Sequence, residues 1–312
     1  MADVIAGAGA RPLVSVIMPA YNAAGFVREA IASVLQQTLR DFELIVVDDA
    51  STDATAQVVG GLGDARIVLI RLERNSGAVG ARNAGIAIAR GEYIALLDAD
   101  DLADPRRLAL QVDLLRHSGA DLCAANYRRW DPLSGRVRGG FQYQRDADLK
   151  ALLTVYCPIG NSTVTGKAAA FQGAAYDPAF AHAEDYELWT RLAAQGCRFV
   201  ATTEALMTYR LHEGQSSIRN RERVEAAATA VREAYLRRLG IEAAWAPRRL
   251  PWRRRLRVAP HFLRLLRNRF GPVSVRANRE IYARFQFHGN GWLTPLVRLE
   301  RLLAAAWARY GG

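Results

Sequence analysis

The segment YIALLDADD, residues 93–101, consists of a short apolar run followed by three aspartates. The run YIALL has the composition of a buried strand, and Asp98, Asp100 and Asp101 come directly after it. Carboxylates gathered this closely raise one another's pKa and cost stability unless positive charge compensates them. The segment therefore predicts a strand that ends at a site where a hard divalent cation could bind.

Three further apolar runs precede this strand and alternate with helical patterns. The runs cover residues 13–18, 42–47 and 66–72, and helices are expected over 24–37 and 78–90. Continuous apolar strands that alternate with helices are typical of a mainly parallel sheet with helices on both faces. We therefore expect a Rossmann-like α/β fold in this part of the chain.

Unusual polar residues follow three of the four predicted strands. They are PAYN at 19–22, DDAS at 48–51 and DADD at 98–101. In open α/β sheets, ligands bind beyond the carboxyl ends of the strands. We expect these three segments to meet there in one binding site.

Helix capping explains some of these acids without any ligand. Asp104 precedes Pro105, a residue that suits the first turn of a helix, and Asp101 could share this capping role. Neither Asp98 nor Asp100 has such an explanation. These two are the stronger candidates for ligand binding.

The pattern is looser after residue 102. Helices are expected over 104–117 and 184–195, and strands over 121–127 and 206–211. From about residue 219 the chain has the composition of arginine-rich helices. Four residues should break these helices: Pro247, Pro251, Pro260 and Gly271.

Positive charge is concentrated near the C-terminus. The 312 residues carry a net charge of +11, and residues 232–312 contain 18 Arg and 4 Glu, a balance of +14. The rest of the chain therefore sums to +11 − 14 = −3. Such a basic segment suits an anionic membrane or nucleic acid, and nucleic acid is the weaker choice because no base-reading module accompanies the charge.

Two interpretations of the basic segment stay open. Residues 245–270 interleave Trp, Leu and Arg, and could form an interfacial helix on anionic lipid. They could equally form a helical subdomain that packs on the core or a homo-oligomer interface, with the arginines in solvent. The apolar face in either case would consist of Leu256, Phe262, Leu263, Leu265 and Leu266.

Cysteine usage and the N-terminal sequence bear on the cellular compartment. The three cysteines, Cys123, Cys157 and Cys197, are isolated and fit a reducing cytoplasm. Residues 1–12 have no basic signal-peptide region and are expected to be a flexible lead. No apolar segment reaches the roughly 18 residues of a transmembrane helix. We expect a cytoplasmic protein, peripheral at the inner face of the membrane if the basic segment binds lipid.

Four motifs together resemble the family 2 glycosyltransferases with a GT-A fold. They are VSVIMPAYNAAGFVREAIASVLQQT, FELIVVDDASTDAT, NSGAVGARNAGIAIARGEYIALLDADD and EDYELWTRL, in this order. The resemblance covers about residues 13–215. It implies inverting transfer of a sugar from a nucleoside-diphosphate sugar, with a uridine nucleotide expected, assisted by Mg²⁺ or Mn²⁺.

The resemblance also implies a division of the chain. Residues 13–218 would be the catalytic domain, with a nucleotide-binding half at 13–101 and an acceptor half at 102–218. Residues 219–312 would be a basic helical region. The acceptor would be a glycan or a lipid-linked sugar used in surface polysaccharide or glycolipid synthesis.

Residues after the first two strands resemble the family's nucleobase pocket. The lining residues would be Pro19, Ala20 and Tyr21, and Tyr21 offers an aromatic face. Asp49 would accept a hydrogen bond from the base. Helix capping is the other role for an acid here, but Ser51 and Asp53 already supply it.

The NSGAVGARN segment resembles the part of the family that closes over the nucleotide. Asn75, Gly77, Arg82 and Asn83 would belong to it, and Gly77 with Gly80 would permit close backbone approach. Arg82 would pair with a carboxylate or a phosphate. A purely structural role for Arg82 stays open.

The resemblance assigns separate roles to the remaining acids. Asp98 would bind the ribose or the sugar, and Asp100 would ligate the metal, whose charge offsets that of the leaving diphosphate. Glu184 and Asp185 match the family's acidic pair, with Asp185 as the general base. Helix capping is the alternative for this pair, because acids favour helix N-termini.

The stretch YRLHEGQSS, residues 209–217, resembles the loop that covers the diphosphate. Arg210 would contact the phosphates, His212 would reach the metal or a phosphate, and Ser216 would assist. A lone histidine is more often structural, so both roles of His212 stay open.

Other functions are less compatible with the sequence. A nucleotidyltransferase would need a Gly-rich N-terminal phosphate loop with a lysine, and a dinucleotide oxidoreductase would need G-x-G-x-x-G after the first strand. A non-catalytic nucleotide-sugar or membrane-surface binding protein would have lost its acids, whereas Asp98, Asp100 and Asp185 are all present. A metal-dependent hexosyl- or N-acetylhexosaminyltransferase is the leading hypothesis.

Overall fold

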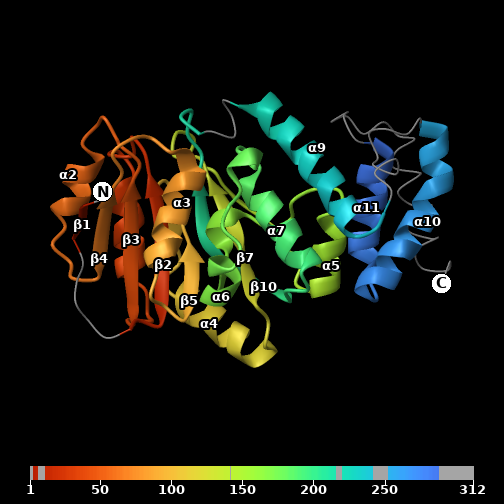
Figure 1. Cartoon of the computed structure of the whole chain (residues 1–312), viewed down its shortest axis with the longest axis horizontal. Helices are drawn as coiled ribbons and strands as arrows, with labels where there is room; N and C mark the ends of the chain where they lie inside the picture. Colours follow the sequence, from red (N-terminus) through yellow and green to blue (C-terminus); the bar gives the residue numbers. More distant parts are fainter. Residues whose placement is uncertain (1–2, 6–10, 141, 216–219, 242–251, 288–312) are drawn as a thin grey trace.

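The computed structural model describes residues 3–5, 11–140, 142–215, 220–241 and 252–287. Their strands join into one mixed sheet with helices on both sides (Figure 1). The strand order is β1–β4–β3–β2–β5–β9–β7–β10–β6, and β8 pairs with β7. The predicted α/β class with a mostly parallel sheet is confirmed.

Parallel strands form the half of the sheet that the apolar runs predicted. They are β2 (Val14–Ala20), β3 (Phe42–Asp48), β4 (Ile67–Arg71) and β5 (Tyr93–Leu96). Each pairs in parallel with its neighbour in the order β4–β3–β2–β5. Their carboxyl ends therefore share one edge of the sheet, as expected.

Part of the predicted flexible lead belongs to the sheet. Strand β1 (Asp3–Ile5) pairs antiparallel with β4 and forms the outer edge. That prediction is therefore wrong for these three residues. A strand so short has no hydrophobic periodicity by which the sequence could reveal it.

The second half of the sheet contains long and short strands. The long pair, β7 (Leu122–Trp130) and β10 (Phe199–Arg210), is parallel and extends the two predicted strands. Strand β9 (Thr165–Lys167) runs antiparallel between β5 and β7 and joins the two halves. The sequence missed β9, as well as the other short strands β6 (Leu102–Ala103) and β8 (Val137–Gly139).

Helices cover both faces of the sheet. One apolar core includes side chains of α1 (Val27–Leu35), α2 (Thr55–Gly60) and α4 (Arg107–Ser118). The other includes side chains of α3 (Gly77–Ile88), α5 (Asp146–Leu152), α6 (Ala168–Gln172) and α7 (Glu184–Ala194). Strand β2 contributes alternate residues to the two cores, because successive side chains of a strand point to opposite faces.

The C-terminal helices lie at the end of the molecule opposite β1 and β4 (Figure 1). They are α9 (Arg221–Arg238), α10 (Trp252–Phe270) and α11 (Val275–Phe287). Short 3-10 turns, η1 (Asn161–Thr163) and η2 (Pro178–Phe180), lie between α5 and α7 along the chain. Among the described residues, no helix combines the length and apolar character needed to cross a membrane.

The apolar face of α10 packs inward. Phe262, Leu263 and Leu266 are buried in the same core as α3 and α7, and Leu265 is half-buried. The prediction of a break at Pro260 is wrong, because α10 continues through it. Packing of this face accounts for the continuation, since tertiary contacts offset a missing backbone hydrogen bond. The arrangement favours the packed subdomain over the interfacial helix for this part of the segment.

Other parts of the basic segment lie outside the described residues. The predicted breaks at Pro247 and Pro251 lie outside the described residues, and so does the side chain of Leu256. Ser216, which precedes the basic segment, also lies outside them. The described arginines Arg264, Arg267 and Arg269 are exposed. Gly271 ends α10, as the sequence predicted, with a φ of 83° that favours glycine.

Candidate active site

Each acid of the DADD segment has a different cationic or polar partner. The Arg82 Nη2 lies 2.8 Å from Asp98 Oδ1, and His212 Nε2 lies 2.9 Å from Asp100 Oδ2. Asp101 is 1% exposed and accepts a long hydrogen bond of 3.4 Å from the backbone N–H of Arg210. The three carboxylates therefore do not form a single bare cluster.

Arg82 joins two segments that are far apart in sequence. Its Nη1 donates to Glu184 Oε1 at 2.7 Å, while Nη2 holds Asp98. The guanidinium also lies over the ring of Tyr176, 5.6 Å from its centroid. Arg82 therefore pairs with two carboxylates, the first of the two kinds of partner expected for it from the sequence. One buried side chain thereby connects the end of β5 with the start of α7.

Asp100 and His212 form a pair of potential metal ligands. The ring of Phe26 packs on His212, with centroids 4.5 Å apart, and fixes the imidazole in place. Burial is the main cause that raises the pKa of Asp100, and the charge of Asp98 raises it further. The hydrogen bond with His212 lowers this pKa. The described residues contain no group of three or more His, Cys, Asp or Glu that could hold a metal.

This donor set fits a divalent ion that also binds a nucleotide. Mg²⁺ is usually held by one or two carboxylates together with substrate phosphates, and Mn²⁺ also prefers oxygen ligands. Asp100 would supply the carboxylate and His212 a nitrogen donor. Diphosphate oxygens and water would complete the coordination, so a third protein ligand is not required.

Asp101 is a buried structural acid. The suggested capping role is wrong, because α4 begins at Arg107 and Asp101 instead bonds the backbone of Arg210. Burial raises its pKa well above the usual range, as do the charges of Asp100 and Asp98, while the Ser162 side chain lowers it. Asp104 does accept from the N–H of Arg106 at 3.0 Å, in the turn just before α4.

Arg210 is enclosed by aromatic rings at the end of β10. Its guanidinium lies 5.4 Å from the ring centroids of both Phe26 and Trp130. Nη2 lies 2.7 Å from Glu29 Oε2, and the residue is only 5% exposed. Among the described residues, its buried Nε has no hydrogen-bond partner. Arg210 is therefore a fixed positive charge two residues from His212.

Asp185 lies at the N-terminus of α7, directly after Glu184. Burial raises the pKa of Asp185 to about 7, and the neighbouring charge of Glu184 adds to this. Arg82 and a hydrogen bond from the backbone N–H of Tyr186 act in the opposite direction. A carboxyl group whose pKa lies near neutrality can exchange a proton at physiological pH.

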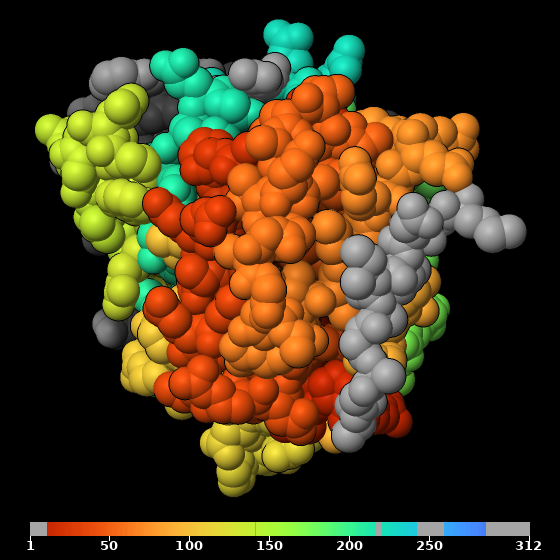
Figure 2. Space-filling model, turned by 90° about the vertical axis from the view of Figure 1, so that its left-hand side faces the viewer, coloured from red at the N-terminus to blue at the C-terminus, as the bar shows by residue number. Residues whose placement is uncertain are grey.

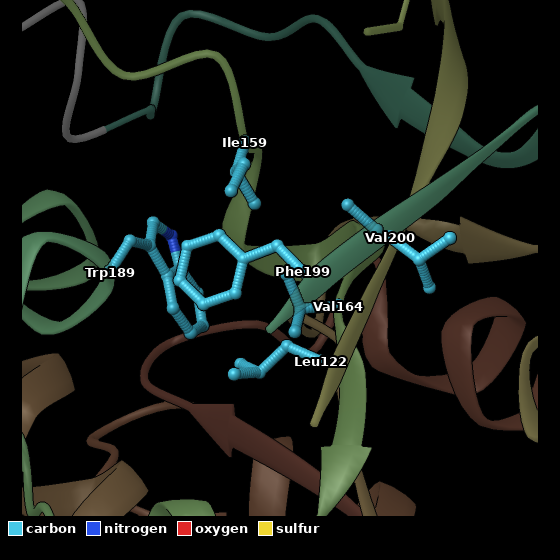
Figure 3. Close-up of a pocket in the computed structure, with 7 residues that line it drawn as sticks. Leu122, Ile159, Val164, Trp189, Phe199 and Val200 are labelled. Atoms are coloured by element: carbon cyan, nitrogen blue, oxygen red, sulfur yellow. The ribbon is translucent and has the colours of Figure 1, made fainter. Parts of the chain in front are cut away.

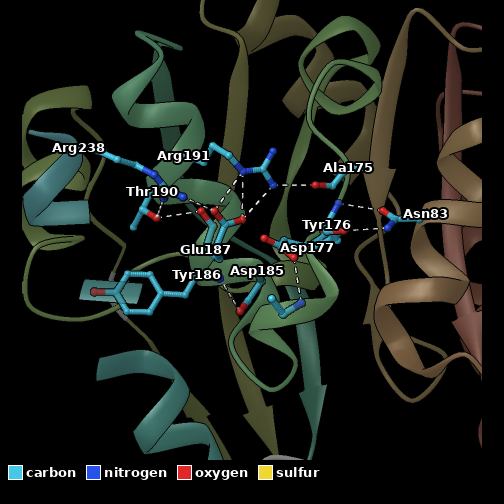
Figure 4. A network of polar contacts seen from close by, with 11 residues as sticks. Asn83, Ala175, Tyr176, Asp177, Asp185, Tyr186, Glu187, Thr190, Arg191 and Arg238 are labelled. Atoms are coloured by element: carbon cyan, nitrogen blue, oxygen red, sulfur yellow. Dashed lines mark hydrogen bonds and ion pairs between the residues drawn. The ribbon is translucent and has the colours of Figure 1, made fainter. Parts of the chain in front are cut away.

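A polar network holds helix α7 in place (Figure 4). Glu187 is fully buried and accepts from Arg191 at 2.9 Å and from Arg238 of α9 at 2.8 Å. The hydroxyl of Tyr186 donates to the backbone carbonyl of Leu153. These contacts orient the helix that carries Asp185.

Asp49 anchors the segment that begins α3. Its Oδ1 accepts from the backbone N–H of Ser76 at 2.7 Å, and its carbonyl accepts from Asn75 Nδ2 at 3.2 Å. Burial raises the pKa of Asp49, while backbone hydrogen bonds from Ser76 and Gly77 lower it. The structure thus brings Asp49, Asn75 and Gly77 together. Gly77 has a φ of 70°, a left-handed conformation that favours glycine.

The residues predicted to line the nucleobase pocket lie next to this segment. Pro19 and Ala20 end β2, and the carbonyl of Ala20 accepts from the N–H of Asp49 at 2.9 Å. Tyr21 follows and is 51% exposed, so its aromatic face is accessible. The predicted capping role of Ser51 is wrong, because its hydroxyl accepts from the N–H of Asn22 at 3.0 Å and α2 has no side-chain cap.

Asp53 and Asn83 also have structural partners. Asp53 accepts from the N–H groups of Ala24 and Thr55, so it connects the start of α2 with the turn before α1. Asn83 exchanges two hydrogen bonds of 2.9 Å with the backbone of Tyr176 (Figure 4). Asn83 therefore fastens α3 to the chain before α7.

A small cavity lies between α7 and the strands β7 and β10. Figure 3 shows Trp189, Phe199 and Ile159 around it, and the remaining lining residues are also apolar. Apolar cavities of this kind usually stay dry. Its size and lining exclude a sugar or a nucleotide, so it belongs to the core.

Several residues near the acids were missed by the sequence analysis. Phe26 and Trp130 enclose Arg210, Tyr176 lies beneath Arg82, and Ser162 Oγ accepts from the N–H of Asp98 at 3.1 Å. None of them forms a local motif with the acids. The pairing of Glu184 with Arg82 had no signal either, because the two residues are separated by 102 positions.

The fold and the acidic edge define a class of enzyme. A mixed sheet that gathers Asp49, Asp98, Asp100 and the Glu184–Asp185 pair at its carboxyl edge is the GT-A arrangement of glycosyltransferases. The sequence model for glycosyl transferase family 2 matches residues 15–177, more than half of the chain. The protein belongs to this family of glycosyltransferases.

Curated relatives are named as glycosyltransferases or as a polysaccharide biosynthesis protein. An uncharacterized glycosyltransferase of Haemophilus influenzae is 32% identical over 74% of this chain and 76% of the relative. The succinoglycan biosynthesis protein ExoO of Rhizobium meliloti is 34% identical, covering 74% and 70%. The Escherichia coli WfaP, a UDP-Glc:alpha-D-GlcNAc-diphosphoundecaprenol beta-1,3-glucosyltransferase, is 31% identical, covering 66% and 80%.

Solved structures share the fold. Staphylococcus aureus TarS in complex with UDP-GlcNAc superimposes with a TM-score of 0.58 at 19% identity, over 95% of this chain and 89% of TarS. A mannosyltransferase of Pyrobaculum calidifontis in complex with GDP-Man and Mn²⁺ has a TM-score of 0.52 at 18% identity, covering 96% and 88%. At such identities the likeness concerns the fold.

Proposed function

We propose that this glycosyltransferase is an inverting enzyme that transfers a sugar from a uridine-diphosphate sugar to a lipid-linked acceptor. The observation that carries the proposal is the double ion pair of Arg82. It holds Asp98, the acid expected on the donor, and Glu184, the neighbour of the expected base, on one guanidinium at 2.8 and 2.7 Å. The acid expected to bind the donor and the expected general base therefore lie in one site. Direct displacement of the nucleoside diphosphate by the acceptor hydroxyl requires this.

Asp185 is the general base in this proposal. It takes the proton from the acceptor hydroxyl as that oxygen attacks the anomeric carbon, while the bond to the nucleoside diphosphate breaks on the opposite face. A base with a pKa near the working pH is the most effective. Burial beside Glu184 produces that pKa in Asp185, and the Glu187 contacts hold its helix in place.

The nucleoside-diphosphate donor binds along the carboxyl edge of the sheet. Tyr21 packs on the base, Asp49 and Asn75 bind the nucleoside side, and Asp98 binds the ribose or sugar. Asp100 and His212 would hold Mg²⁺ or Mn²⁺, which would supply charge neutralisation at the diphosphate. Arg210 adds a fixed positive charge nearby.

The nature of donor and acceptor is inferred from relatives. WfaP and a second E. coli relative, WfgD, are named as using UDP-Glc and a diphosphoundecaprenol-linked GlcNAc. TarS structures contain UDP-GlcNAc or UDP. We therefore infer that this chain also uses a uridine nucleotide and a lipid-linked acceptor. Such an acceptor would bring the enzyme to the inner face of the cell membrane.

The variant Asp185→Asn tests the assignment of the base. It is nearly isosteric but cannot accept a proton, so transfer should fall by about a hundredfold or more. Assays should measure uridine diphosphate released from a panel of UDP-sugars with a lipid-diphosphate acceptor, and donor affinity should stay within a few fold. The control Asp177→Asn changes a half-buried acid that caps η2, a role that the amide oxygen of asparagine can also fill, and should leave transfer intact. Full transfer by Asp185→Asn would remove it as the base.

A further inference from the structure

The hairpin of β7 and β8 is strongly basic and outside the site described above. Residues 127–140 contain four arginines and one acid, Asp131, which gives a net charge of 4 − 1 = +3. The arginines are all exposed: Arg128, Arg129, Arg136 and Arg138. In the described part of the chain, none of them forms an ion pair with a carboxylate. The hydrogen bond from the Ser134 side chain is the main interaction that lowers the pKa of Asp131, and the charge of Arg136 makes a smaller contribution in the same direction.

Two of these arginines face each other across the hairpin. Arg129 is the direct register partner of Arg138 in the antiparallel pair. Like charges directly opposite each other destabilise a strand pair. The charge of Arg129 is partly offset by the ring of Tyr127, whose centroid lies 5.7 Å from the guanidinium. An external anion bound between the two guanidinium groups would remove the repulsion.

The tip of the hairpin exposes large apolar side chains. Leu133 is 93% exposed and Val137 is 58% exposed. The turn has a defined shape, because Asp131 accepts from the N–H of Leu133 at 3.0 Å and from Ser134 Oγ at 2.5 Å. Leu133 is therefore held outward by its turn. A small soluble anion would pair with the arginines, but it would not explain why apolar side chains are exposed between them.

The base of the hairpin adjoins the candidate active site. Trp130, the last residue of β7, lies over Arg210, and its carbonyl accepts from the N–H of Leu211 at 2.8 Å. The next residue, His212, pairs with Asp100. In Figure 2 the yellow-green atoms of the hairpin region project from the upper left of the molecule, beside the turquoise atoms of the chain around β10 and α9.

We propose that the β7–β8 hairpin docks the enzyme on an anionic lipid surface. Leu133 enters the boundary between head groups and acyl chains, while Arg129 and Arg138 bind lipid phosphates between them. Exposed apolar residues flanked by basic ones are suited to this interface. The choice of a membrane rests on the lipid-linked acceptor of the proposed function. A membrane at the hairpin would present such an acceptor next to Asp100 and His212.

The surface assigned here differs from the basic segment near the C-terminus. Phe262, Leu263 and Leu266 of α10 are buried in the core, and the fully exposed side chains of α10 among residues 259–270 are polar or charged. The hairpin combines exposed arginines that form no ion pair within the described residues with accessible apolar side chains. It therefore has both elements that interfacial binding uses.

Vesicle co-sedimentation of the full chain tests the proposal. Wild type should sediment with phosphatidylcholine vesicles that contain phosphatidylglycerol, and much less with phosphatidylcholine alone. Each arginine near an anionic surface contributes about a fivefold change in partitioning, so Arg129→Gln/Arg138→Gln should bind about 25-fold more weakly. Leu133→Ser should also weaken binding. The matched control is Arg264→Gln/Arg267→Gln on α10, which removes the same charge and should have a much smaller effect.

The outcomes separate this proposal from the proposed function. Uridine diphosphate affinity, measured by calorimetry, should be equal in wild type and hairpin variants, because no hairpin side chain in question contacts the nucleotide residues. Loss of sedimentation confined to the hairpin variants supports the proposal, even if no nucleotide binds to any protein. Equal sedimentation of wild type and hairpin variants overturns it, and so does a loss confined to the α10 variant.

Discussion

The acids of the DADD segment differ in their partners, and this difference sets their chemistry. Asp98 is paired with Arg82, Asp100 with His212, and Asp101 is buried against the backbone of Arg210. The sequence revealed the importance of Asp98 and Asp100 because they follow an apolar strand. It could not reveal Arg82's second partner, Glu184, since that contact depends on how α3 and α7 pack.

The pH dependence of transfer tests the environment of Asp185. The base is active when ionised, and the ionised fraction rises as pH increases through its pKa of about 7. The rate constant kcat/KM should therefore fall on the acid side of pH 7 and level off above it. Arg82 lowers this pKa, so Arg82→Gln should move the acid limb to higher pH.

A second arginine near α7 serves as the control. Arg191 pairs with Glu187 of the same helix and is absent from the groups that shift Asp185. Arg191→Gln should leave the midpoint of the acid limb unchanged. A midpoint that stays fixed in Arg82→Gln as well, measured over the full pH profile, would contradict the electrostatic role assigned to Arg82.

Helix α3 is an example of an element that the sequence predicts. Its length and apolar pattern, like those of β2 to β5, carry enough periodic residues to be recognised. Strand β9 has three residues, Thr165–Lys167, and exists because β5 and β7 both offer it pairing partners. Such short strands depend on tertiary pairing, so no local pattern predicts them.

Close packing of α3 on the sheet depends on Gly85. A methyl group at this position would lie 2.8 Å from Ile17 Cγ2 and 3.2 Å from Val47 Cγ2, both in the buried core. Gly85→Ala should therefore lower the free energy of unfolding by about 1–3 kcal/mol, as other overpacked cores do. Equilibrium urea unfolding measures the change.

The matched control is a helical glycine in open space. Gly60 ends α2, and nothing lies within 4 Å of a methyl group built there. Gly60→Ala should be neutral or stabilise by up to about 1 kcal/mol. Equal unfolding free energies for the Gly85 and Gly60 variants would mean that α3 does not pack on β2 and β3 as described.

The whole molecule combines the catalytic sheet with helices at its far end. Composition located the basic segment and its apolar residues, but left open whether they face lipid or protein. The structure shows Phe262 and Leu266 fully buried in the core that also contains α7 and the sheet. The direction of an amphipathic face depends on its neighbours, which composition does not contain.

Truncation of a buried side chain of α10 tests this packing. Leu266→Ala should lower the free energy of unfolding by about 2–5 kcal/mol, because it leaves a cavity in the shared core. Urea unfolding of the full chain, followed by circular dichroism, measures this loss. The exposed Arg264→Ala on the same helix should change stability by no more than about 0.5 kcal/mol. An unchanged stability of Leu266→Ala would indicate that this face is free.

The central claim is that one edge of the sheet binds a nucleoside diphosphate together with a divalent cation. Calorimetric titration of uridine diphosphate with and without Mn²⁺ tests it most directly. Mn²⁺ should strengthen binding in wild type and should fail to do so in Asp100→Ala, which removes the carboxylate ligand. Equal affinity with and without Mn²⁺ in wild type, or an unchanged Mn²⁺ effect in Asp100→Ala, would show that this edge does not bind the two together.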